Sequence, residues 1–263
     1  LSFLGYGKKI IDAILLIGPV AFVTVFFSHA THFASLEDYK TLTSMTRKAF
    51  RLLMYFSIPV TAILLGLREP IIRILFEGGK FGTESTLGTS QAFMIYSCGL
   101  VTFSLESLIV HSFFALSDTK TPVKLGILCV ILDIVLAVLF LKPYGYLGIA
   151  SALVISKTVK VCILLFLLNR QLKGLLGIQL LLFSLKIVII ALLMWVSMRL
   201  IVGLQTNATF LSTVIFDLIL PSIAGMSVLA VCSYAFNIQE FRTIVSILKK
   251  KSRFTETFIE QED

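Results

Sequence analysis

Long hydrophobic runs recur along this chain and are separated by shorter polar connectors. An α-helix needs about 20 mostly apolar residues to cross the hydrocarbon of a bilayer. The runs are continuous, whereas membrane β-strands would alternate apolar and polar positions over about ten residues. The pattern therefore predicts an all-α, polytopic transmembrane helical bundle with about seven spans, at 10–30, 49–67, 87–113, 122–141, 146–168, 180–203 and 208–236.

Two of the connectors carry local structural signals. The stretch 68–89 predicts a short amphipathic interfacial helix that ends at Gly78-Gly79, with Thr83 or Ser85 capping the next span. The stretch "HSFFALSDTKTPVKLG", 111–126, places a polar turn between two spans. It predicts a hairpin over 114–121 in which Asp118 braces the helix that starts at Thr121-Pro122.

Composition agrees with a membrane class. The chain is 57% hydrophobic and only 14% charged, with a mean hydropathy of +0.96, whereas a soluble domain is about 25% charged. The net charge of +8 comes from basic residues that flank the spans, so we expect contact with membrane lipids and not with nucleic acid. Because the chain starts at Leu1, we expect a piece of a longer protein.

Basic residues near the ends of the runs predict the orientation. If seven spans alternate, Lys and Arg are enriched on the side of 31–48, 114–121, 169–179 and the C-terminal end. The positive-inside rule makes this side cytoplasmic. The tail 241–254 adds apolar residues at helical spacing and then a basic cluster, typical of a segment that lies on an anionic leaflet or of an ordinary cytoplasmic tail.

Several charges interrupt the hydrophobic runs. A charge in hydrocarbon is costly and usually meets a partner or a water-filled cavity. Glu106, Asp133, Lys157 and Lys160 are therefore candidates for an intramembrane charge network. We expect Asp133 to pair with Lys157 or Lys160, which lie on one helix face; lining of a substrate or ion path is the alternative. In the last two runs Lys186 and Asp217 are expected to pair, and Arg199 to anchor at the interface.

Enzymatic motifs are absent from the sequence. It contains no GK[ST] phosphate loop, no HExxH and no GxSxG. The four cysteines and three histidines are scattered, so we expect no metal, disulfide framework or cofactor. The expectation is a transporter driven by an ion gradient or the membrane potential.

An ordered set of motifs resembles the MurJ (MviN) family over Leu1 to Gln171: "REPIIRILFEGGKF", "YSCGL", "FFALSDTKTPVKLG", the carboxyl or amide position in "LDIVLAVLFL", and "GYLGIASAL". The resemblance implies flipping of undecaprenyl-linked lipid II across the bacterial inner membrane. It also implies the fold of the multidrug/oligosaccharidyl-lipid/polysaccharide exporter superfamily, with two six-helix bundles followed by two extra helices.

The resemblance also implies a domain organisation. Residues 1–171 would be part of the second bundle, 172–237 the two extra helices, and 238–263 a basic cytoplasmic tail. The chain would supply spans eight to fourteen, and the partner would be the missing N-terminal half of the same protein. One substrate-binding position follows: the family's cavity arginine aligns in "GYGKK" with Lys8, beside Lys9, and a preceding family aspartate aligns with Gly7.

Three functions remain open from the sequence. The first is the C-terminal portion of a lipid II flippase that works by alternating access. The second is a related exporter of another polyprenyl-linked oligosaccharide or of a drug; acidic cavity residues would favour a cationic drug, and cavity lysines a diphosphate. The third is a membrane scaffold that transports nothing and recruits partners through 31–48 or the basic tail.

Overall fold

Seven helical segments long and apolar enough to cross a membrane are found in the described part of the chain, which confirms the predicted fold class. The computed structural model describes residues 2–79, 81–202 and 213–242. The first span consists of three consecutive elements, α1 (Ser2–Leu15), η1 (Leu16–Val20) and α2 (Ala21–Ser35). The next five are single helices: α3 (Tyr39–Gly66), α5 (Thr83–Ala115), α6 (Lys120–Tyr144), α7 (Tyr146–Gln171) and α8 (Ile178–Val202). The seventh span combines η2 (Thr213–Ile219) and α10 (Leu220–Ala235).

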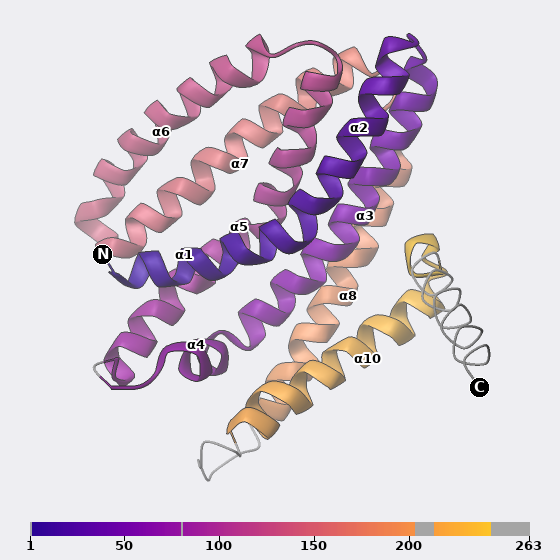
Figure 1. The fold of residues 1–263 in the computed structure, drawn as a ribbon. Coiled ribbons are helices and arrows are strands. Elements are labelled where there is room, and N and C mark those ends of the chain that lie inside the picture. The colour runs from indigo at the N-terminus through magenta and orange to yellow at the C-terminus, as the bar shows by residue number, and fades with distance from the viewer. Residues whose placement is uncertain (1, 80, 203–212, 243–263) are drawn as a thin grey trace, which may run out of the picture.

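The first span bends in its middle, where the sequence reads Gly18-Pro19. Proline cannot donate a backbone hydrogen bond, and a wide π turn is one way in which a helix accommodates it. That turn is η1, and Figure 1 shows α1 and α2 running in clearly different directions on its two sides. An added Cβ at Gly18 would lie 2.7 Å from the ring of Phe56 on α3. Glycine therefore lets the bend pack directly against α3.

The hairpin after α5 forms as predicted. Asp118 Oδ1 accepts the backbone N–H of Thr121 at 3.0 Å, and Thr121 Oγ1 donates to Asp118 Oδ2 at 2.7 Å. The Thr121 hydroxyl and amide hold the pKa of Asp118 below its usual range, so the cap is ionised at neutral pH. Ser117 turns the chain with a positive φ of 59°.

The predicted short helix is also present, as α4 (Arg68–Phe76), and it ends before Gly78 and the left-handed Gly79, whose φ is 58°. Its position at the membrane interface stays a prediction. The predicted caps of the next span were wrong. Helix α5 begins at Thr83 after Gly82, without a side-chain cap. Thr83 lies inside the first turn and therefore cannot serve as the cap that precedes it.

Helix α5 is the centre of the arrangement, with α1, α2, α3 and α7 packed around it. Fully buried Phe93, Leu100 and Phe113 lie along its length and contribute to two hydrophobic clusters. Helix α6 is different: it packs almost wholly on α7 and lies at the edge of the bundle in Figure 1. Its outer face is apolar and open, as at Val138, which is 68% exposed, so it is suited to contact lipid or further protein.

Polar contacts join the connectors at one end of the bundle, the upper end of Figure 1. Arg47 on α3 donates to the backbone carbonyls of Gly174 and Leu175. Gln171 Nε2 donates to Asp118 Oδ2 at 3.3 Å, which connects the end of α7 to the α5–α6 hairpin. These are the connectors that the charge bias places together on the cytoplasmic side; their sidedness stays a prediction. Most of the predicted tail, from 243 onward, lies outside the described residues.

We expect a cysteine at Ser117 to react with a membrane-impermeant thiol reagent only from the cytoplasmic side. Glu84→Cys, at the exposed start of α5, is the matched control and should react only from the opposite side. Both are introduced after the native cysteines have been replaced, and labelling is compared in intact cells and in inverted vesicles. Labelling of Ser117→Cys in intact cells alone would reverse the predicted topology.

Candidate functional site: charges within the spans

Two groups of charged side chains lie within the membrane-spanning helices. The first joins α5 to α7. Both carboxylate oxygens of Glu106 lie 2.9 Å from Lys157 Nζ, and Oε1 lies 2.7 Å from Lys160 Nζ. The side chains of Glu106 and Lys160 are only 14% and 11% exposed. One carboxylate thus bridges two ammonium groups, and the cluster keeps a net charge of about +1.

The predicted pairing of Asp133 was wrong. Both lysines meet Glu106, and within the described residues no ion pair to Asp133 is found. The reason is the packing: α7 lies against α5 along much of its length, whereas α5 and α6 touch only near their shared hairpin. Glu106 and Asp133 lie on the two sides of that hairpin in the sequence, but α5 and α6 diverge from it. Lys157 and Lys160 on α7 contact Glu106 on α5.

The expected pair between Lys186 and Asp217 is not formed either. No ion pair joins the two residues in the described part of the chain. Residue Asp217 belongs to η2, which packs on α4 and so brings Arg73 near. The sequence of the last two spans alone could not show that α4, a connector helix from earlier in the chain, packs on η2.

The second group lies on α1 and contains the predicted substrate-binding lysines. Lys8 Nζ lies 2.7 Å from Asp12 Oδ2, with side chains 45% and 54% exposed. Lys9 Nζ lies 5.9 Å from the centroid of the Tyr6 ring, at the outer limit of a cation–π contact. Asp12 was missed by the sequence reasoning, although its spacing of four residues from Lys8 was the available signal.

Close helix packing explains why Gly7 carries no carboxylate. An added Cβ at Gly7 would lie 3.0 Å from the backbone nitrogen of Phe93, so α1 and α5 approach each other there. An aspartate at this position would force the helices apart. Asp12, about one turn beyond Lys8, provides the negative charge instead.

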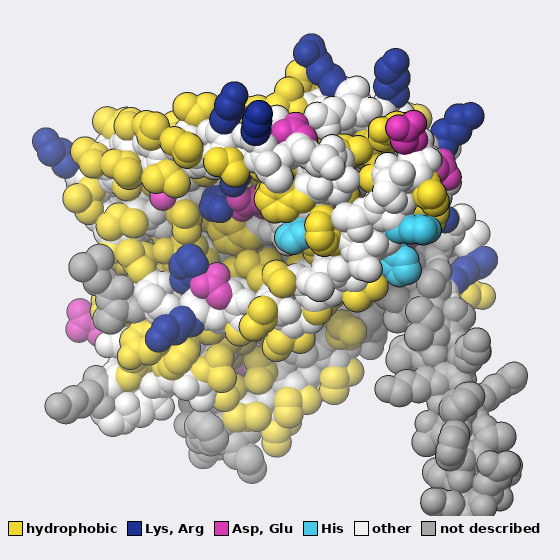
Figure 2. All heavy atoms as spheres, turned by 45° about the horizontal axis from the view of Figure 1, so that its top comes forward, with side chains coloured by type: hydrophobic (Ala, Val, Ile, Leu, Met, Phe, Trp, Pro, Cys, Tyr) yellow, Lys and Arg dark blue, Asp and Glu magenta, His cyan; other side chains and the backbone are white. Residues whose placement is uncertain are grey.

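The two groups place charge inside an apolar surface. Figure 2 shows basic and acidic side chains lying close together among yellow hydrophobic ones. In the described residues no group of three or more His, Cys, Asp or Glu side chains is arranged to hold a metal ion. The chemistry that these groups offer is therefore electrostatic: cations that can attract an anion, partly balanced by carboxylates.

Comparison with known proteins fits this picture. The sequence profile of the family described as Lipid II flippase MurJ matches residues 1–222. The chain belongs to the MurJ lipid II flippase family. A probable lipid II flippase MurJ from Synechocystis sp. is 31% identical over 156 residues, which cover 59% of this chain and 28% of the relative. The lipid II flippase MurJ of Thermosipho africanus is 33% identical over 130 residues, covering 49% of this chain and 27% of the relative.

A solved structure shows the same fold. The lipid II flippase MurJ in an inward closed conformation aligns with a TM-score of 0.75 and 26% identity, covering 93% of this chain and 48% of that one. The chain thus spans about half the length of that MurJ structure. As a MurJ family member with seven candidate spans, it is a multi-pass membrane protein.

We expect Glu106→Gln to lower the amount of inserted protein strongly, because it leaves two ammonium groups in the membrane without a carboxylate. Loss of one partner of a buried ion pair costs about 3–5 kcal/mol. The triple variant Glu106→Gln, Lys157→Met, Lys160→Met should recover most of the loss, since no unpaired charge remains. Membrane abundance is measured for each variant.

Asp133→Asn is the matched control for that series. Since no ion pair to Asp133 is found in the described residues, the variant should lower the amount of inserted protein far less than Glu106→Gln does. A fall in abundance as large as that of Glu106→Gln would contradict the assignment of the lysines to Glu106.

Proposed function

We propose that the protein containing this chain flips undecaprenyl-linked lipid II across the bacterial inner membrane, with these residues forming its C-terminal half. The observation that carries the proposal is the exposed cationic pair Lys8 and Lys9 within the first span of a chain that belongs to the MurJ family. A charge on a membrane span needs a partner or a water-filled cavity. The missing N-terminal half is proposed to close that cavity from the other side.

The lysines are proposed to attract the diphosphate of the cargo. In a low-dielectric cavity an ammonium–phosphate contact is a strong, charge-assisted hydrogen bond. Lysine provides a point charge and lacks the planar fork with which arginine holds two oxygens at once. Asp12 holds Lys8 in place and reduces its net charge, so it weakens binding enough for the cargo to leave again. Lys9 lies over the ring of Tyr6, and within the described residues no ion pair to it is found.

The cluster of Glu106, Lys157 and Lys160 has a structural role in this proposal. Its groups satisfy one another between α5 and α7 and so hold the second bundle together as one body. Alternating access requires such rigid bodies, because two bundles rock against each other around a fixed site.

The energy source follows from the charge of the cavity. We infer a transporter without a cofactor and without an enzymatic step, driven by an ion gradient or by the membrane potential. One elementary charge that crosses the whole potential contributes about 2.3 kcal/mol per 100 mV. A net positive cavity that changes its access from one side to the other is therefore sensitive to that potential.

A related exporter with another polyprenyl-linked cargo is the second candidate. The same cations would hold any polyprenyl diphosphate, and only a transport assay with defined head groups separates these cargoes. A drug exporter would need acidic cavity residues, and Glu106 is engaged by two lysines. Asp133, which forms no ion pair in the described residues, is the carboxylate that such an exporter would have to use.

We expect Lys8→Glu to abolish growth when the full-length gene is the sole source of lipid II flipping, because it places two carboxylates where a diphosphate should bind. Lys8→Arg should support growth, since it keeps the charge and adds a fork that holds phosphate. Complementation of a strain depleted of its flippase measures both.

Lys142→Glu, at the exposed end of α6, is the control for a general effect of lost positive charge and should support growth. Normal growth of Lys8→Glu, with insertion verified by immunoblot, would reject Lys8 as a cargo ligand and transfer the assignment to Lys9.

A further inference from the structure

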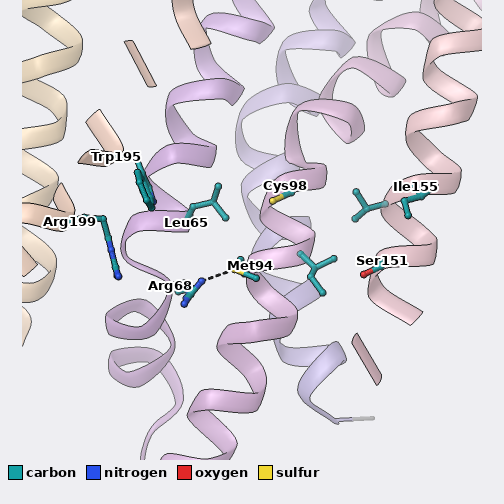
Figure 3. A pocket seen from close by; sticks show the side chains of 10 residues that line it. Leu65, Arg68, Met94, Cys98, Ser151, Ile155, Trp195 and Arg199 are labelled. Atoms are coloured by element: carbon teal, nitrogen blue, oxygen red, sulfur yellow. Dashed lines mark hydrogen bonds between the residues drawn. The ribbon is translucent and has the colours of Figure 1, made fainter. Parts of the chain in front are cut away.

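Helix α8 leaves an open crease against the bundle. It packs on α3 and α10 but makes almost no direct helix contact with α5 or α7. A cavity of about 560 Å³ occupies part of this crease, lined by the end of α3, the start of α4, and α5, α7 and α8. Figure 3 shows Arg68 and Arg199 on one side of it, near Trp195 and Leu65, and Ser151 and Ile155 on the other.

Both arginines have unused hydrogen-bond donors. The Nε atom of Arg68 is buried and has no partner, and the nearest carboxylate, of Glu69, lies 3.5 Å from Nη2. The short contact of Nη1 goes to the sulfur of Met94, which is a weak acceptor. Arg68 thus keeps a buried Nε donor beside its long ion pair with Glu69, and within the described residues Arg199 has no ion pair. Both guanidinium groups line one cavity, and a phosphate oxygen is an acceptor whose geometry suits their remaining donors.

The cavity continues into an apolar one. A second cavity of about 470 Å³ shares Leu65 and Trp195 with the first and extends between α3, α5 and α8. Its lining is hydrophobic except for Thr61. The crease therefore offers cations at one end and an apolar channel beyond them. This is the pattern of a phosphate head group joined to a hydrocarbon chain.

We propose that this crease binds an anionic glycerophospholipid, with its phosphate on Arg68 and Arg199 and one acyl chain between α8 and α5. The site is separate from Lys8 and Lys9 and does not depend on the proposed cargo. A cavity of about 560 Å³ suits a small phosphate head group better than a disaccharide with a peptide, which favours a glycerophospholipid over the cargo. The lipid would fill the gap that the protein leaves and fix α8 to the bundle.

Arg68 and Arg199 also lie at a depth that suits a head group. Arg68 is the first residue of α4, directly after α3 ends, and Arg199 lies in the last turn of α8. Both are therefore close to the same end of the bundle, where a lipid phosphate lies, and the apolar cavity leads from them toward the membrane interior.

The only tryptophan of this sequence, Trp195, lines both cavities and reports on the occupant. The full-length protein is reconstituted in phosphatidylcholine vesicles that contain a small, varied fraction of phosphatidylglycerol with brominated acyl chains. Quenching that disappears in Trp195→Phe is assigned to this site. We expect brominated phosphatidylglycerol to quench at a fraction about tenfold or more below that needed for brominated phosphatidylcholine. The double variant Arg68→Gln, Arg199→Gln should remove this preference, and each single variant should weaken it about fivefold.

Lys142→Gln is the matched control, since it removes a positive charge from an exposed position away from the crease, and it should keep the preference. If the double variant does not insert, Arg199→Gln alone decides, because that side chain is exposed and its loss leaves the core intact. Equal quenching by the two lipids, or a preference unchanged in Arg199→Gln, would overturn the proposal. Release of the quenching by undecaprenyl phosphate at stoichiometric amounts would also overturn it, because the crease would then belong to the cargo.

Discussion

The cost of placing charge in hydrocarbon is the constraint on which this structure depends. Glu106, Lys157 and Lys160 neutralise most of one another's charge, and this requires α5 and α7 to lie side by side at mid-membrane. The pair Lys8–Asp12 is different because both side chains are about half exposed on α1. One charge group therefore holds helices together, while the other needs a polar space outside this chain. This contrast is the basis on which a structural role is proposed for the first group and a cargo-binding role for the second.

Close helix approach is the second constraint, and it determines where charge can lie. At Gly7 the backbone of α5 leaves no room for a side chain, so the carboxylate that balances Lys8 comes from Asp12. At Gly148 an added Cβ would overlap the carbonyl oxygen of Phe140, which keeps α6 and α7 tightly paired after the turn at Gly145. Helix α7 thus packs on both α5 and α6, while α6 lies at the edge and exposes an apolar face.

Much of the fold was predictable because hydrophobic runs and turn residues act locally. The seven candidate spans, the short helix α4 and the contacts by which Asp118 braces the start of α6 all follow from residues that are neighbours in the sequence. The partners of the intramembrane charges were not predictable in the same way. Whether Lys157 meets Glu106 or Asp133 depends on which helices pack, and that is decided by contacts far apart in the sequence. The lysines at 8 and 9 were identified through the family resemblance, and the position of Asp12 beside Lys8 could have been predicted from their spacing of four residues. The Arg68–Arg199 crease gave no sequence signal, because its residues come from five helices.

The central claim is that the charged face of α1 borders water within the membrane, whereas α6 borders lipid. The most direct measurement is the reaction rate of single cysteines with a charged, water-soluble thiol reagent in membranes of the full-length protein. Asp12→Cys and Ile134→Cys form the pair to compare. Asp12 lies ten residues after the start of α1 at Ser2, and Ile134 lies ten residues before the end of α6 at Tyr144. The side chains at both positions are more than half exposed in this chain. The account predicts fast labelling of Asp12→Cys and almost none of Ile134→Cys, since a thiol must be hydrated to ionise and react. Equal protection of the two positions would contradict a hydrated cavity along α1, and with it the role proposed for Lys8 and Lys9.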